Sequence, residues 1–190
     1  ASKGEGLGNK FLAHIREVDA ICQVVRCFND DNITHVSGKV DPISDIEIIN
    51  LELILADLES VDKRLARVIK MAKQRDKEAL AEEPVLTRLK EAFEAGKSGR
   101  SVEFTEEEQR VVKGFHLLTT KPMLYVANVS EDDIMADGEN EYVQKVRAFA
   151  AEEGAEVTAS FMTIAEPILP HLITFVIFFV IALGLFLATG

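Results

Sequence analysis

The stretch AICQVVRCF, residues 20–28, decides the fold class of this chain. It is a nearly continuous apolar run with β-branched residues, which is typical of a strand buried on both faces of a parallel sheet. Residues 122–128 (PMLYVAN) repeat this pattern, and residues 155–157 begin a third strand. Helical patterns separate the three runs. The sequence therefore predicts an α/β fold with a parallel sheet that a helical insertion interrupts.

A long helical segment lies between the first two predicted strands. Ser44 and Glu47 have the spacing of a capping box. An apolar seam at spacings of three and four then follows, formed by Leu51, Ile54, Leu58, Val61, Leu65, Val68 and Ala72. A second helical pattern begins at Pro84 and ends at Gly96. The two helices are predicted to pair as an antiparallel hairpin.

Three shorter helices complete the pattern. Residues 9–18 predict one, and the capping box of Thr105 and Glu108 predicts another that ends at Lys113. The apolar period across residues 139–153 predicts the third, with Gly154 as its C-cap.

The carboxyl-terminal segment has a different composition from the rest of the chain. Residues 158–190 contain no Lys or Arg and a single carboxylate, Glu166. At 1.5 Å per residue, residues 168–189 would span about 30 Å, which is the thickness of the bilayer's hydrocarbon core. This segment predicts one transmembrane-type helix, with a buried core helix as the alternative.

Charge limits the choice of partners. The formal net charge is −11, which opposes non-specific binding to nucleic acid or anionic lipid. One strongly basic stretch comprises Lys63, Arg64, Arg67, Lys70, Lys73, Arg75 and Lys77. A solvated helix face explains it, and docking to an RNA-rich partner is the alternative. Cys22 and Cys27 are expected to be reduced core thiols.

Two short motifs bear on nucleotide binding. Residues 96–98 (GKS) match the end of a Walker A loop, but position 91 is Glu and helical residues precede it. We interpret them as a helix-terminating turn. Residues 128–131 (NVSE) follow the second strand, where GTP-binding proteins carry Asn-Lys-x-Asp to read guanine. Val129 and Glu131 depart from that pattern, and a polar turn explains these four residues better when they are taken alone.

Longer stretches place this motif in a context. Residues 2–21 (SKGEGLGNKFLAHIREVDAI), 29–53 (NDDNITHVSGKVDPISDIEIINLEL), 100–109 (RSVEFTEEEQ) and 121–133 (KPMLYVANVSEDD) resemble the YchF-type Obg-like ATPases. That family is a branch of the P-loop GTPase superfamily that prefers ATP. The resemblance covers residues 1 to about 157 and does not extend into the hydrophobic tail.

The resemblance implies a nucleotide site. Asn128 would contact the adenine edge, Val129 would pack near it, and Glu131 would end the altered base-recognition motif. Phe28 would line the same base pocket, with a simple core phenylalanine as an equal alternative. ATP and Mg²⁺ are the ligands of the complete family member, which hydrolyses ATP, associates with ribosomes and is cytoplasmic.

Catalytic and metal-binding residues are not expected in this chain. In the family, the phosphate-binding loop, switch I and the Asp-x-x-Gly motif precede the position of residue 1, and ATP hydrolysis depends on their contacts. We therefore expect a fragment that is inactive as it stands and binds nucleotide weakly.

These patterns, together with what the resemblance implies, give the predicted organisation. Residues 1–44 and 119–157 form the partial nucleotide-binding domain, residues 45–118 the helical coiled-coil insertion, and residues 158–190 the hydrophobic tail. The expected partners are ATP, the ribosome through the coiled coil, and a membrane through residues 168–189; sequence-specific DNA binding is not expected. The alternative function is a tail-anchored coiled-coil adaptor without catalytic activity.

Overall fold

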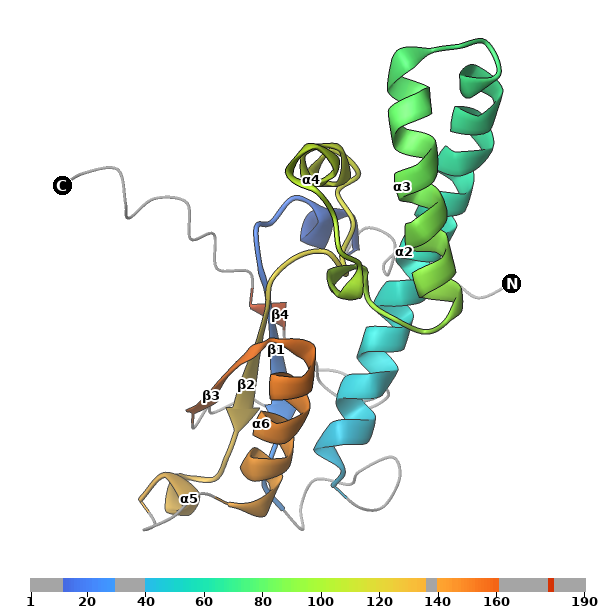
Figure 1. The fold of residues 1–190 in the computed structure, drawn as a ribbon. Helices are drawn as coiled ribbons and strands as arrows, with labels where there is room; N and C mark the ends of the chain where they lie inside the picture. Colours follow the sequence, from blue (N-terminus) through green and yellow to red (C-terminus); the bar gives the residue numbers. More distant parts are fainter. Residues whose placement is uncertain (1–11, 30–39, 136–139, 161–177, 180–190) are drawn as a thin grey trace, which may run out of the picture. The chain divides into compact units, whose positions relative to one another are not determined.

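The computed structural model describes residues 12–29, 40–135, 140–160 and 178–179 (Figure 1). The chain divides into two compact units. The helical unit comprises Ala1–Val18 and Ile49–Lys121, and the sheet unit comprises Asp19–Ile48 and Pro122–Gly190.

The sheet unit is built on three parallel strands. These are β1 (Ile21–Arg26), β2 (Met123–Asn128) and β3 (Glu156–Ser160), in the order β3-β2-β1. Residues Val24 and Val25 of β1 are only 4% and 2% exposed, as the continuous apolar run predicts. The predicted α/β fold with a parallel sheet is therefore confirmed for these strands.

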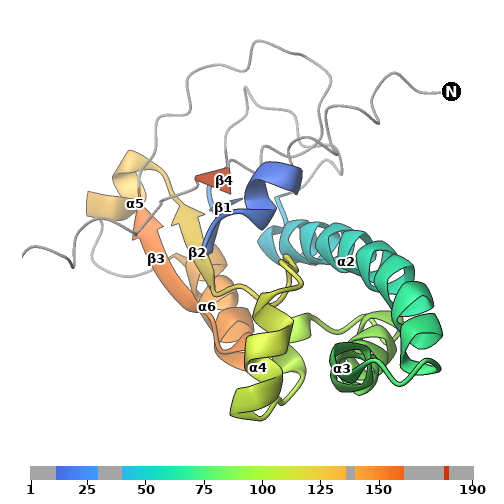
Figure 2. The same ribbon diagram turned by 90° about the horizontal axis from the view of Figure 1, so that it is seen from above.

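Helix α6 (Glu141–Glu153) packs against β2 and β3 (Figure 2). Its Phe149 ring lies edge-on to the ring of Tyr125 on β2, with 6.1 Å between the centroids. The Tyr125 hydroxyl donates to the Glu153 carboxylate over 2.8 Å. Gly154 has a φ of 67° and caps the helix, as predicted. A short helix, α5 (Glu131–Met135), precedes α6 and was not predicted.

The transmembrane-type helix predicted for residues 168–189 lies almost wholly outside the described residues. Its two described residues form the strand β4 (Phe178–Phe179), which pairs antiparallel with β1 at Cys22 and Gln23. At these two positions the helix prediction is wrong, because phenylalanine also suits strands and the pairing satisfies backbone groups along the β1 edge. In the parts of the chain that the structure describes, no helix is both long enough and apolar enough to span a membrane.

The helical unit contains the predicted antiparallel hairpin. Residues 49–72 of helix α2 (Pro42–Ala72) pair with helix α3 (Lys77–Glu94) (Figure 1). Their shared core includes Ile54, Val61, Val68, Val85, Leu86, Leu89 and Phe93. Leu51 was predicted to join this seam, but its side chain is 52% exposed, so the seam begins at Ile54.

Both hairpin helices begin earlier than the sequence predicted. The Asp41 carboxylate accepts the N–H of Ser44 over 3.2 Å, and Pro42 is the first helical residue. Asp41 rather than Ser44 therefore caps α2, with proline in its favoured first position. Asp76 caps α3 by accepting the N–H of Ala79 over 2.9 Å. Pro84, which was predicted to start α3, lies inside that helix.

The 3-10 helix η1 (Gly99–Ser101) and helix α4 (Glu106–Lys113) complete the helical unit. The predicted capping box is present: the Thr105 N–H donates to Glu108 over 3.0 Å, and Thr105 Oγ1 accepts the Glu108 N–H over 3.3 Å. Arg88 of α3 forms an ion pair with Glu108 and lies 5.3 Å from the centroid of the Phe104 ring. These contacts attach α4 to the hairpin.

Candidate functional site

The carboxyl ends of β1 and β2 bring two predicted site residues to one edge of the sheet. Arg26, the last residue of β1, is in register with Asn128, the last residue of β2. The Cys27 N–H donates to the Asn128 carbonyl over 2.7 Å, and Phe28 follows directly. In open parallel sheets, ligands bind outside the carboxyl ends of the strands. This edge is therefore the candidate site.

Asn128 and Val129 lie within the protein rather than on its surface. Their exposed fractions are 1% and 3%. The Val129 N–H donates to the carbonyl of Ser160, the last residue of β3, over 3.1 Å. Contact between a base and the Asn128 amide therefore requires the surrounding segments to move aside.

Phe28 is half-buried and contacts Arg26, a residue that the sequence analysis did not single out. The Arg26 guanidinium carbon lies 4.9 Å from the centroid of the Phe28 ring, and Arg26 Nε donates to the Phe28 carbonyl over 3.0 Å. This is a cation–π contact. A purine that stacks on Phe28 must take the opposite ring face or displace the guanidinium. The one sequence signal that could have identified Arg26 is a charged residue within an otherwise apolar run.

The segment after Asn128 folds back on itself through Ser130 and Asp133. Ser130 Oγ donates to Asp133 Oδ2 over 2.6 Å and accepts the Asp133 N–H over 3.2 Å. Hydrogen bonds from Ser130, and a weaker one from Asn140, hold the pKa of the Asp133 carboxyl below its ordinary value. Glu131 is exposed and begins α5.

Asn140 is the second residue that sequence reasoning missed. Its Oδ1 accepts the Val143 N–H over 2.8 Å, which caps α6. Its Nδ2 donates to the Cys27 carbonyl, also over 2.8 Å. An asparagine before an apolar helix signals the cap, but no local pattern signals a bond to a residue so distant in the sequence.

The remaining motifs have structural roles. Gly96 has a φ of 72°, and the Lys97 N–H donates to the Ala92 carbonyl over 2.9 Å, so residues 96–98 end α3 as predicted. Cys22 and Cys27 are free thiols. Among the described residues, no group of three or more His, Cys, Asp and Glu side chains is arranged to hold a metal ion.

The fold and the site define an α/β protein with a parallel sheet, a candidate ligand site at the carboxyl ends of its strands, and a helical hairpin between β1 and β2. Comparison with protein-family models finds no match. The chain is nevertheless 69% identical over 157 residues to the ribosome-binding ATPase YchF of Bacillus subtilis, and 51% identical over 157 residues to that of Haemophilus influenzae.

Those matches cover 83% of this chain but only 43% and 42% of the two relatives. The solved structure of the Schizosaccharomyces pombe YchF GTPase is similar, with a TM-score of 0.71 and 36% sequence identity. It covers 85% of this chain, which in turn covers 44% of that protein. Over the matched stretch the chain belongs to the YchF family, and it spans less than half the length of these relatives.

Proposed function

We propose that the carboxyl edge of the sheet binds the base of a purine nucleotide and prefers adenine. One observation carries the proposal: the pairing of β1 with β2 joins the strand ends that bear Phe28 and Asn128. The YchF relatives from bacteria are named as ATPases, which supports ATP as the ligand.

The side chains at this edge suit a purine. An asparagine amide can donate to N7 and accept from the amino group of adenine at the same time. A half-buried aromatic ring offers a stacking surface to the base. Glu131 is exposed at the start of α5, where its carboxylate reaches further than the aspartate that reads guanine in GTP-binding proteins.

Base recognition is the part of ATPase function that we assign to this chain's described residues. ATP hydrolysis with Mg²⁺ is proposed for the complete protein of the family, since it requires contacts with the phosphates. Among the described residues, no group of three or more His, Cys, Asp and Glu side chains is arranged to hold a metal ion, and we assign none of them a role in binding Mg²⁺.

A titration of the isotope-labelled 190-residue chain, followed by NMR, tests this proposal. We expect ATP to shift the side-chain amide of Asn128 and the backbone amides of Phe28 and Val129 more than GTP does, and CTP to shift them least. Asn128→Ala should remove the difference between ATP and GTP. Equal shifts with ATP and CTP, or shifts confined to other parts of the chain, would contradict the proposal.

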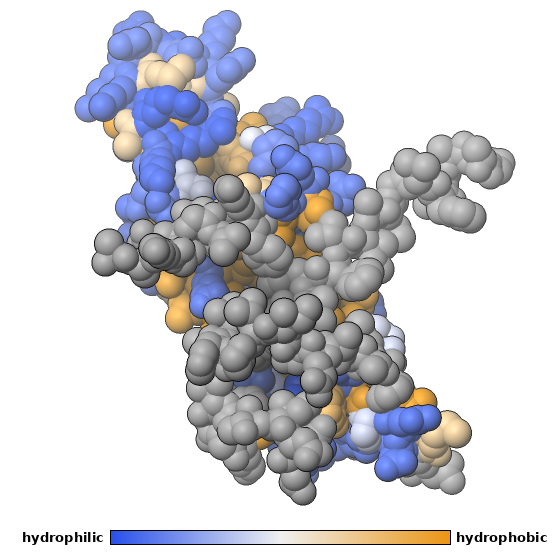
Figure 3. Space-filling model, turned by 180° about the vertical axis from the view of Figure 1, so that it is seen from behind, coloured by the Kyte–Doolittle hydropathy of each residue, from blue (hydrophilic) through white to orange (hydrophobic). Residues whose placement is uncertain are grey.

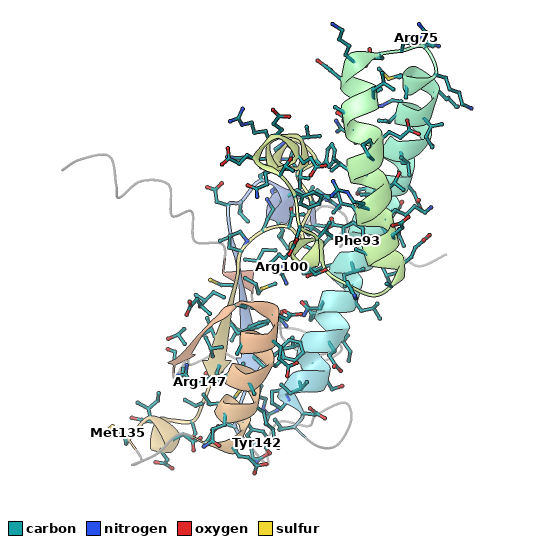
Figure 4. All side chains as sticks on the ribbon, viewed as in Figure 1. Arg75, Phe93, Arg100, Met135, Tyr142 and Arg147 are labelled. Atoms are coloured by element: carbon teal, nitrogen blue, oxygen red, sulfur yellow. The ribbon has the colours of Figure 1, made fainter. Side chains whose placement is uncertain are left out.

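A second candidate function rests on the basic stretch of the hairpin. Lys63 and Arg64 are paired with Glu59 and Glu82, at 2.5 Å and 2.6 Å. The other five basic residues are exposed and have no ion pair among the described residues: Arg67, Lys70, Lys73, Arg75 and Lys77. We call these five the hairpin-end surface. Arg75 lies at the turn between α2 and α3 (Figure 4).

We further propose that the hairpin-end surface binds RNA phosphates of the ribosome. Hydrophilic side chains cover most of the end of the hairpin on the face that Figure 3 shows. Unpaired basic side chains are the groups that phosphate binding uses, because no internal ion pair must first be broken. The named activity of the YchF relatives, ribosome binding, supports this partner.

A further inference from the structure

Hydrogen bonds join the segments that meet at the candidate base site. The backbone of Cys27, one residue before Phe28, is bonded on both sides: its N–H donates to the Asn128 carbonyl over 2.7 Å, and its carbonyl accepts from Asn140 Nδ2 over 2.8 Å. The end of β1 is therefore attached to both the end of β2 and the start of α6.

Asp133 lies beside the base-recognition segment. Its carboxylate accepts a hydrogen bond from Ser130 Oγ over 2.6 Å. The Asn140 side chain makes a smaller contribution than Ser130 to lowering the pKa of Asp133. The one side chain that is bonded to the Cys27 carbonyl therefore also lies near the end of residues 128–131.

We propose that Asn140 is a positioning residue that holds the Cys27–Phe28 peptide, and with it the Phe28 ring, in place beside the end of β2 and thereby sets the preference for adenine. This inference rests on the proposed base site. It differs from that proposal because Asn140 acts through Cys27 and does not contact the base.

The alternative is that Asn140 serves only as the cap of α6. The geometry separates the two roles, because Oδ1 accepts the Val143 N–H and Nδ2 makes the attachment to Cys27. Serine is as good a cap as asparagine, but its short hydroxyl cannot replace the Nδ2 attachment. Asn140→Ser therefore removes the positioning contact and keeps the cap, whereas Asn140→Ala removes both.

The phenolic hydroxyl of Tyr142 supplies a matched control. It donates to Asn29 Oδ1 over 3.3 Å and so also joins α6 to the segment after β1. Among the described residues, no hydrogen bond joins this hydroxyl to Cys27 or to the end of β2. Tyr142→Phe removes a hydrogen bond of the same reach without changing the attachment that Asn140 makes.

The experiment measures ATP and GTP dissociation constants by NMR titration of the full chain and of Asn140→Ser, Asn140→Ala, Tyr142→Phe and Asn128→Ala. The melting temperature of each protein is recorded as well. We expect Asn140→Ser to melt near the temperature of the parent protein. It should weaken ATP binding about fivefold and bring the dissociation constants for ATP and GTP closer together. In the nucleotide-free protein, the backbone amides of Phe28 and Ser130 should shift. Tyr142→Phe should leave the ratio unchanged.

The outcomes separate this inference from the proposed base site. If Asn128→Ala removes the ATP preference but Asn140→Ser keeps the parent ratio and parent amide shifts, Asn140 is only a cap and the inference is wrong. If Asn128→Ala leaves the preference intact, or the parent chain prefers neither nucleotide, the base site fails and the inference fails with it. The Asn140→Gln side chain retains an amide donor. If this variant keeps the parent ratio of the ATP and GTP dissociation constants, the positioning role of Asn140 is supported further.

Discussion

Asp57 of α2 lies fully buried against Arg16, with 3.0 Å between Asp57 Oδ1 and Arg16 Nη1. The same carboxylate accepts the N–H groups of Leu118 and Thr119, over 3.0 Å and 2.8 Å, and the Thr119 hydroxyl over 2.8 Å. Four donors therefore converge on one side chain within the helical unit. Asp57 joins the hairpin to the loop that precedes β2 and to the helical turn at residues 12–16.

Replacing Asp57 should destabilise the helical unit strongly. Asp57→Ala removes the acceptor for a partly buried guanidinium and for two buried backbone N–H groups, and breaking a buried ion pair in this way costs about 3–5 kcal/mol. Urea unfolding, with the m-value checked for constancy, measures the change in unfolding free energy. Glu59→Ala, which removes an exposed ion pair two residues away, is the control and should change stability little. Equal effects of the two substitutions would contradict the role given to Asp57.

Gly99 should not tolerate a side chain. A Cβ atom at this position would lie 2.6 Å from Thr120 Cγ2 and 3.1 Å from Thr119 Oγ1. Thr119 cannot yield easily, because its hydroxyl is bonded to Asp57 and to the Gly99 N–H. We expect Gly99→Ala to lower the unfolding free energy by about 1–3 kcal/mol.

Gly114→Ala is the matched control for that substitution. Its backbone is in the right-handed helical region, and the nearest atom to a Cβ there lies 3.3 Å away. The change in unfolding free energy should stay within about 1 kcal/mol. Alanine reduces the conformational freedom of the unfolded chain, and this gain offsets the slight crowding of its Cβ against the Val111 carbonyl. A Gly99→Ala protein as stable as Gly114→Ala would mean that the loop at residues 117–120 adapts.

The Cys27 thiol should make stability fall at high pH. Burial, with a smaller contribution from the Asp45 carboxylate, raises the pKa of Cys27 from 9.0 to about 12. The folded state resists loss of this proton. The contribution of the thiol to the free energy of unfolding is therefore complete below pH 9.0 and is lost as the pH rises towards about 12. Urea unfolding across this range should show a steeper decline for the parent chain than for Cys27→Ala. Parallel declines would show that the thiol does not contribute.

Removing positive charge from the hairpin-end surface should weaken binding to ribosomes. Lys70→Ala with Lys73→Ala removes two exposed, unpaired cations. If each contacts one phosphate, the slope of log affinity against log salt should fall by about 0.7–0.9 per residue. Sedimentation with purified ribosomes at several salt concentrations measures this slope. Lys97→Ala with Lys113→Ala removes equal charge elsewhere in the helical unit and is the control. If this pair lowers the affinity for ribosomes as much as the first pair does, the effect comes from net charge and not from the hairpin-end surface.

Local sequence patterns predicted the elements of this fold well. The strands, the capping box of α4 and the end of α6 at Gly154 follow from short-range periodicity and from residue types with one strong preference. The helix starts at Asp41 and Asp76 were missed because competing signals at Ser44 and Pro84 occur within the same helices. A capping side chain is identified only by the N–H that it accepts.

The contacts that organise the two units could not be predicted in this way. The acceptor role of Asp57 and the double role of Asn140 depend on residues that come together only after the strands and helices pack. The sequence placed Asn128 and Phe28 at neighbouring strand ends, but it gave no indication that Asn128 is buried or that Arg26 covers Phe28. Sequence patterns thus predict which edge of the sheet to inspect and leave its fine geometry to tertiary packing.

The ratio of the ATP and GTP dissociation constants of this chain, before and after Glu131→Asp, tests the central claim most directly. The structure favours Glu131 for this substitution over Val129, because Glu131 is exposed whereas a charge at buried Val129 would disturb the strand ends. We predict that the parent chain binds ATP more tightly and that Glu131→Asp, by restoring the shorter carboxylate that reads guanine, shifts the ratio towards GTP. Identical ratios for the two proteins, with both still folded, would show that residues 128–131 do not read the base.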